Sequence, residues 1–227
     1  MNRLPGIMKI HLQDKWGWII LPWVILMISF SVNLIIGSTS GVEIYTGGLA
    51  SIHIYMLVAG IASVAQTFPF AISYSVRRKD YFLGTLATIA IISVGSAIIL
   101  WALGYIESEL TGGWGMKLHF FNLPYVSDSN GIGQIWIQAA TMLHLFFLGF
   151  AISSIHRRFG KTGLYTFFLA IFIIMTVSLF LLSFYDRWTV IGDWLGDVTA
   201  IEAASGLSLL TMIYLLFSYS MLRRSTL

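Results

Sequence analysis

Long runs of apolar residues alternate with short polar segments along the whole chain. Each run is at least 22 residues long, whereas about 20 residues of helix cross the hydrocarbon core of a bilayer. The pattern therefore predicts an all-α integral membrane protein with one domain, residues 1–227, and six transmembrane helices. The predicted spans are 16–37, 49–76, 81–106, 134–155, 164–185 and 201–222.

Prolines and small residues mark the first two predicted spans. Pro22 lies in the first turns of its span, where a missing N–H costs least, and Pro69 is expected to kink or end the second span. Small residues also gather in the second span and predict a face that another helix approaches closely. They are Ala59, Gly60, Ala62, Ser63 and Ala65.

Two segments outside the spans carry amphipathic patterns. Residues 1–15 interleave apolar and charged side chains, which predicts a short N-terminal helix in the membrane interface. Residues 186–200 carry an apolar stripe at three- and four-residue steps, which predicts an amphipathic or re-entrant segment at the outer face, before the last span. The stripe consists of Trp188, Ile191, Trp194, Leu195 and Val198.

The basic residues collect on one side of the predicted membrane. With six spans both termini share a side, and eleven of the thirteen Lys and Arg residues fall there. Only Lys117 and Arg187 fall on the other side. Because basic loops stay in the cytoplasm, both termini and the basic elbows at 77–79 and 156–163 are expected to be cytoplasmic.

The composition supports a membrane protein and narrows the possible chemistry. The chain is 57% hydrophobic and 10% charged, against about 45–50% and about 25% in soluble domains. It has no cysteine, which excludes disulfides and thiolate catalysis. No secretory signal peptide is expected, because the first apolar run is long enough to remain as a span.

Motifs for catalysis and for ligand binding are weak. Gly160-Lys161-Thr162 resembles the end of a phosphate-binding loop, but Ile155 stands where that motif needs glycine. The five histidines lack the spacing of metal ligands, and no nucleophile has an evident base. We therefore expect no catalytic, cofactor-binding or metal residue and no nucleic-acid partner. Polar residues within the spans are interpreted as hydrogen-bonding groups between helices, namely Asn33, His53, Gln66, Gln138 and His144.

The first basic elbow carries the most specific motif in the chain. Residues 68–85 read FPFAISYSVRRKDYFLGT. This stretch resembles the segment after the second helix of type-2 ABC transporter permeases, particularly the small six-helix bacterial exporters. The resemblance extends in outline to the six spans, the amphipathic N-terminus and the insert before the last span. The polar segment 107–133 departs from it, because the corresponding connection in the family is usually shorter.

This resemblance implies a permease subunit of an exporter in the bacterial plasma membrane, without an ATPase site of its own. It implies that the elbow is a coupling helix that contacts separate ABC ATPase subunits, which hold ATP and Mg²⁺. In that role the two aromatic residues would fill a pocket of the ATPase, the cations would meet acidic groups and Asp80 would cap the following helix. The implied contact residues are Arg77, Arg78, Lys79, Asp80, Tyr81 and Phe82.

The same reading implies a second permease subunit, identical or related, beside this one in the bilayer. Since the predicted spans offer few charges to solvate a hydrophilic cargo, we expect an amphipathic or hydrophobic cargo such as a peptide, a lipid or a drug. One alternative is a non-transporting immunity or sensor-partner protein that binds a peptide at its outer face through 107–133 and 186–200. An intramembrane enzyme is a further alternative.

Overall fold

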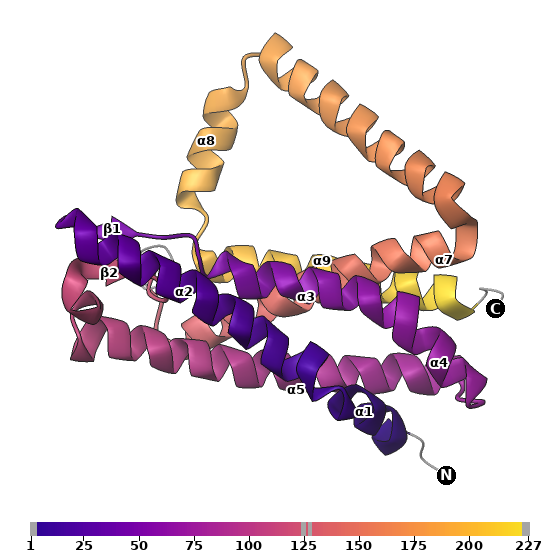
Figure 1. Cartoon of the computed structure of the whole chain (residues 1–227). Coiled ribbons are helices and arrows are strands. Elements are labelled where there is room, and N and C mark those ends of the chain that lie inside the picture. Colours follow the sequence, from indigo (N-terminus) through magenta and orange to yellow (C-terminus); the bar gives the residue numbers. More distant parts are fainter. Residues whose placement is uncertain (1–3, 124–125, 127–128, 224–227) are drawn as a thin grey trace.

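A computed structural model describes residues 4–123, 126 and 129–223, and these residues are almost wholly helical (Figure 1). The long helices are α2 (Leu21–Ser40), α3 (Ala50–Ala62), α5 (Arg78–Tyr105), α7 (Gly131–Phe184) and α9 (Ala200–Arg223). The short helices are α1 (Leu4–Gln13), α4 (Phe68–Ser73) and α8 (Trp188–Asp197). Segments with π-helical hydrogen bonding are η1 (Trp16–Ile20), η2 (Ser63–Thr67), η3 (Ile106–Leu110) and η4 (Gly113–Lys117). Strands β1 (Ile44–Tyr45) and β2 (Leu118–His119) pair in parallel, with Ile44 opposite Leu118.

Several continuous helical stretches are long and apolar enough to cross a membrane, as expected for a multi-pass membrane protein. They are Trp16–Ser40, Ala50–Ser73, Arg78–Leu110, Gly131–Phe184 and Ala200–Arg223. The fourth and fifth predicted spans both lie in α7, whose backbone breaks at Gly160 with φ 69° and ψ −165°. Glycine adopts this conformation at little cost because it has no Cβ. The number of crossings and their orientation remain predictions.

The two prolines follow π-helical segments. Pro22 lies in the first turn of α2, directly after η1, as expected for a tolerated position. Pro69 lies in the first turn of α4, directly after η2, and the helical stretch continues beyond it to Ser73. Since proline cannot donate a backbone hydrogen bond, the wider π turn before it takes up the irregularity without ending the helix.

The core lies where α3, α5 and α9 pack against the first half of α7. The predicted close-approach face of the second span is confirmed at Gly60. A Cβ atom there would lie 2.0 Å from the carbonyl oxygen of Phe146, and a Cβ at Gly149 would lie 2.0 Å from that of Leu57. The backbones of α3 and α7 are therefore in contact, within one chain.

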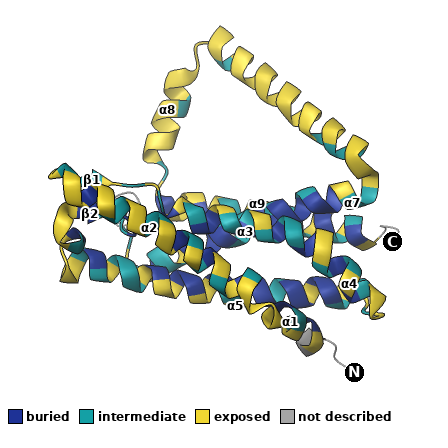
Figure 2. Cartoon of the chain, in the orientation of Figure 1, coloured by how far each residue is buried: buried dark blue, intermediate teal, exposed yellow. Residues whose placement is uncertain are grey.

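The second half of α7 and the whole of α8 leave the bundle. Every buried residue of α7 lies at or before Ile155, and α8 has no buried residue. Figure 2 shows both segments as almost continuously exposed, and with α9 they form the sides of a triangle. In a membrane protein such apolar side chains face lipid or another subunit.

The predicted N-terminal helix is present as α1, and its apolar face contacts protein. Ile7 is 1% exposed and packs on Gly84 of α5, where a Cβ would lie 2.7 Å from the Ile7 side chain. The helix therefore lies against the start of α5, beside the first basic elbow (Figure 1).

Candidate functional site

The first basic elbow is a tight turn between α4 and α5. The chain leaves α4 after Ser73, Ser75 adopts a left-handed φ of 58°, and α5 begins at Arg78. Arg77 is the extended N-cap residue, and no side chain caps this helix. The expected capping by Asp80 is therefore wrong, because Asp80 lies inside the first turn, where its charge favours the helix dipole only by proximity.

Arg78 ties the elbow to the end of the last helix. Its Nη1 atom donates hydrogen bonds to the carbonyl oxygens of Arg223, at 2.7 Å, and Leu222, at 3.3 Å. These are carbonyls that the end of a helix leaves unpaired. Arg77 and Lys79, on either side of Arg78, are exposed. The three cations of the motif thus divide into one internal clamp and two surface charges.

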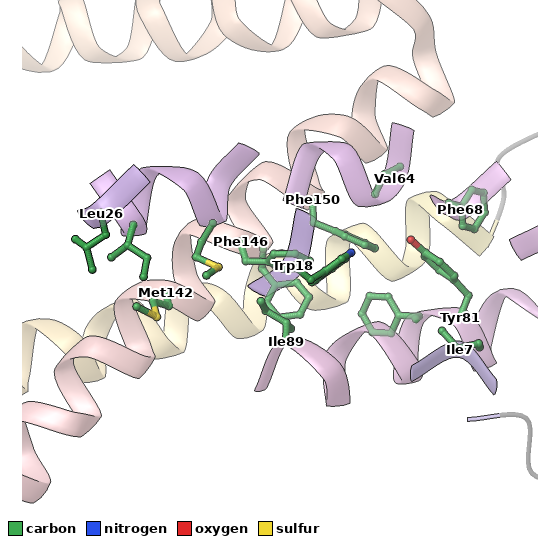
Figure 3. Packing of buried hydrophobic residues seen from close by; sticks show 14 of the residues in the cluster. Ile7, Trp18, Leu26, Val64, Phe68, Tyr81, Ile89, Met142, Phe146 and Phe150 are labelled. Carbon is green, nitrogen blue, oxygen red and sulfur yellow. The ribbon is translucent and has the colours of Figure 1, made fainter. Parts of the chain in front are cut away.

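Tyr81 and Phe82 lie inside the chain, so the expectation that they fill a pocket of a partner is not met by this structure. Tyr81 is 0% exposed, and its hydroxyl donates to the carbonyl oxygen of Ser63 at 2.7 Å and pairs with the Thr67 hydroxyl at 2.8 Å. Figure 3 shows Tyr81 among the buried residues of the core, with Phe68 and Ile7 nearby. The physical reason is helix phase, since α5 begins at Arg78 and turns both aromatic side chains inward.

Phe82 completes this internal packing. Its ring lies 5.2 Å from that of Tyr219 in α9 and 6.0 Å from that of Phe150 in α7, measured between centroids. The start of α5 therefore packs against α7 and α9 through Phe82 and is bonded to η2 through Tyr81.

A different aromatic pair is exposed beside the elbow. Phe70 and Tyr74 are 50% and 66% exposed, and their ring centroids are 4.9 Å apart. With the two exposed cations they make up what we call the elbow surface, formed by Phe70, Tyr74, Arg77 and Lys79. Sequence reasoning missed the aromatic pair, although the i, i+4 spacing in FPFAISY is its signal.

The second basic elbow lies at the same end of the bundle. The guanidinium of Arg157 lies 5.0 Å from the ring centroid of Phe68, and Nη1 of Arg158 lies 3.4 Å from Sδ of Met221 near the end of α9. These contacts bring both elbows and the end of α9 together. Which side of a membrane this end faces stays a prediction.

His11 is a buried polar group that sequence reasoning left without a role. It is 0% exposed, its Nε2 atom lies 2.9 Å from Oγ1 of Thr85, and its ring meets the edge of Trp18 at 4.5 Å. Burial lowers the pKa of His11 from 6.5 to about 4. Its Nδ1 atom has no partner among the described residues. A doubly protonated ring would therefore bury both a charge and an unpaired N–H.

We expect acid to weaken the docking of α1 on α5. The pKa of His11 is about 4 when α1 is docked and 6.5 when α1 is undocked. The free energy of docking is therefore constant above pH 6.5 and weakens as the pH falls from 6.5 to 4. At about pH 5 the loss is about 2 kcal/mol. A fluorescent label on α1 that reports the contact of α1 with α5 would measure this loss of docking as the pH falls. His11→Gln should remove the pH dependence, and an unchanged dependence in that variant would contradict the role of His11.

The opposite end of the bundle is organised around Glu107, in the segment whose role the sequence left open. Glu107 is 0% exposed, and its carboxylate accepts from Nε1 of Trp114 at 2.8 Å. It also accepts from the backbone amides of Phe120, Phe121 and Asn122, at 2.9 to 3.2 Å. The polar segment is therefore folded back as a cap.

Three side chains lie together on this cap at the paired strands, the exposed Glu43 and Tyr45 and the half-buried His119. Tyr45 donates a hydrogen bond to Glu43 at 2.9 Å, and Nε2 of His119 lies 3.1 Å from the same carboxylate. The hydrogen bond from Tyr45, followed by that from His119, lowers the pKa of Glu43. Among the described residues no group of three His, Cys, Asp or Glu is placed to hold a metal ion.

The predicted outer stripe lies on α8 and its end. Trp188, Trp194 and Leu195 are exposed, whereas Ile191 and Val198 are half-buried. The helix is thus present where the pattern predicted it, and its contact with a membrane stays a prediction.

The polar residues within the spans behave in two ways. His144 of α7 lies 3.2 Å from Oγ1 of Thr211 in α9, as expected for a bond between helices. Nδ1 of His53 lies 3.1 Å from the carbonyl oxygen of Leu49, at the start of its own helix. Asn33 donates to the carbonyl oxygen of Ser29 in its own helix, so its predicted interhelical role is wrong. Gln66 is exposed.

Comparisons of the chain with protein-family models, with curated proteins and with solved structures gave no match. The described structure defines a class, a helical protein with several helices long and apolar enough to cross a membrane.

Proposed function

We propose that this chain is the permease subunit of an ATP-driven exporter, located in the bacterial cytoplasmic membrane and worked by a separate ABC ATPase. The chain offers no nucleotide motif of its own, so ATP and Mg²⁺ would bind to the ATPase. The observation that carries the proposal is the first basic elbow. It combines the motif of residues 68–85 with two exposed cations and two exposed aromatic rings, at the junction of two long helices.

The internal contacts of the elbow suit a coupling element. The clamp of Arg78 on α9 and the bonds of Tyr81 to η2 make the turn rigid, so a displacement at its surface moves the helices and is not lost in a flexible loop. Arg77 and Lys79 would meet acidic groups on the ATPase, and Phe70 and Tyr74 would supply apolar contact. This assignment replaces Tyr81 and Phe82 as the aromatic contacts.

The cargo follows from the apolar character of the spans. The candidate spans are rich in Leu, Ile, Phe and Val and poor in charge. Since a hydrophilic ion or sugar would meet few groups to replace its water, we propose an amphipathic peptide, a lipid or a hydrophobic drug. A second permease subunit, identical or related, would complete the path.

Charge reversal at the elbow surface tests the proposal. Arg77→Glu combined with Lys79→Glu should reduce co-purification with the ATPase encoded beside this chain by at least about tenfold, because like charges facing each other across an interface cost several kcal/mol. Lys117→Glu, at the opposite end, is the matched control and should retain full binding. Full binding and full ATPase stimulation by the double variant would overturn the assignment.

A second candidate function is a non-transporting membrane protein that binds a peptide at its outer end. The observation that favours it is the cap around Glu107. Its hydrogen bonds fold the segment more firmly than a simple loop between two helices needs. Peptide binding by the purified chain, with no ATPase bound under any nucleotide condition, would favour this candidate over the exporter.

A further inference from the structure

A polar pocket of about 140 Å³ lies between η1 and η2, near the first basic elbow. Its polar and aromatic lining consists of Asp14, Trp18, Tyr55, Ser63, Gln66 and Thr67. Since a water molecule occupies roughly 30 Å³ in the liquid, the pocket has room for a few waters or for a small polar headgroup. Its η1 side lies where the first apolar run begins, next to Lys15 and Trp16.

The pocket is lined by α3 and by the two π-helical segments η1 and η2. Such π turns are rare and concentrate at functional sites. The wider turns change the usual backbone pairing, and side chains bond to the carbonyls of these segments. Tyr55 donates to the carbonyl oxygen of Gly17 at 2.5 Å, which fixes η1 against α3. Thr67 donates to the carbonyl oxygen of Ser63 at 2.6 Å within η2. The pocket is therefore a built feature, held open by its own hydrogen bonds.

The carboxylate of Asp14 is the charge of this pocket. It accepts one hydrogen bond, from the backbone amide of Gly17 to Oδ1 at 3.1 Å. Among the described residues it forms no ion pair, and this includes the adjacent Lys15. The described residues thus bring a carboxylate to the pocket and place no cation in an ion pair with it.

The other lining groups offer acceptors and aromatic surface. The Ser63 hydroxyl donates to the carbonyl oxygen of Ala59, so its lone pairs can still accept. The amide of Gln66 forms no hydrogen bond to another described residue, which leaves its oxygen free as an acceptor. Trp18 and Tyr55 add rings that attract cations. A carboxylate, two further acceptors and two aromatic rings match the three donors and the positive charge of a primary ammonium group.

We propose that this pocket binds a primary ammonium group, either that of an ethanolamine lipid headgroup or that of an amphipathic amine. The site stands apart from the elbow surface, and its occupation does not depend on an ATPase. It shares Ser63 and Thr67 with the hydrogen bonds that hold Tyr81. An occupant therefore touches the residues that anchor the elbow, so lipid or amine binding is placed to influence it.

Native mass spectrometry of the purified full chain, without any ATPase, tests the proposal. The probes are phosphatidylethanolamine and phosphatidylcholine with the same acyl chains, added in turn, and dodecylamine as the free amine. We expect the wild type to retain phosphatidylethanolamine over phosphatidylcholine, and Asp14→Asn to lose about tenfold in this preference, as for the loss of one charge-assisted hydrogen bond. Glu43→Gln, an exposed carboxylate at the other end, is the matched control and should retain it.

The arms of the experiment separate the two sources of the ammonium group. Displacement of the lipid by dodecylamine in the wild type, and not in Asp14→Asn, assigns the site to ammonium ligands in general. Retention of the lipid against dodecylamine assigns it to the ethanolamine headgroup. Equal retention of both lipids together with no dodecylamine adduct, or an unchanged preference in a folded Asp14→Asn variant, would overturn the proposal and leave a water-filled pocket.

Discussion

Replacement of Gly149 by alanine is expected to lower the unfolding free energy by about 3 kcal/mol, because the new methyl group has no room between α3 and α7. Its Cβ would lie 2.0 Å from the carbonyl oxygen of Leu57 and 3.1 Å from the backbone nitrogen of Ile61. A side chain can rotate away from such a contact, but a helix backbone cannot. The two helices must therefore move apart. In a thermal melt of the purified protein, Tm should fall by on the order of 10 °C.

Gly95→Ala provides the matched control for this variant. Gly95 also lies within a long helix, α5, but a Cβ there meets no atom within 4 Å. Since alanine favours helix over glycine by about 1 kcal/mol, its Tm should be unchanged or slightly higher. Equal melting of the Gly149 and Gly95 variants would show that α3 and α7 are not packed backbone to backbone.

Replacement of Glu107 by alanine is expected to open the cap at the other end of the bundle. The change leaves the Trp114 indole and three backbone amides without their acceptor, and each unpaired buried donor costs about 1–3 kcal/mol. Opening the segment to water recovers part of this cost, so we expect a local loss on the order of 4 kcal/mol. Hydrogen exchange of the amides at 120–122 should accelerate by at least about 100-fold, since each 1.4 kcal/mol is a factor of ten.

Glu109→Ala tests whether this effect is specific to the buried carboxylate. Glu109 lies two residues away and is exposed, so its loss should leave exchange at 120–122 unchanged. If both variants exchanged alike, the acceptor role of Glu107 would be wrong.

The helices could largely be predicted from the apolar runs, because about 20 apolar residues in succession have few alternatives to a membrane helix. The gap between the fourth and fifth runs, 156–163, contains the break at Gly160. The cluster of small residues in the second span predicted the close approach at Gly60, and the apolar stripe predicted a helix within 186–200. These features depend on composition and spacing within one segment, which a sequence displays directly.

The direction of the elbow side chains was harder to predict. Treating residues 77–82 as one contact motif ignores the helix that begins at Arg78, whose phase places Tyr81, Thr85 and Ile89 on the inner face. Glu107 and His11 were missed for another reason. The backbone partners of Glu107 lie 13 to 15 residues away and the partner of His11 lies 74 residues away, and nothing in the local sequence indicates such pairs.

We propose that an ATPase binds the elbow surface, and because the chain has no cysteine this contact can be tested at single sites. A lone cysteine at Lys79 or, as a control, at Lys117 can be labelled with a membrane-impermeant maleimide in the assembled complex and in the chain alone. We predict that the ATPase blocks labelling of Lys79→Cys from the cytoplasmic side and leaves Lys117→Cys open from the opposite side. Undiminished labelling of Lys79→Cys in the full complex, or labelling of both positions from one side, would contradict the account.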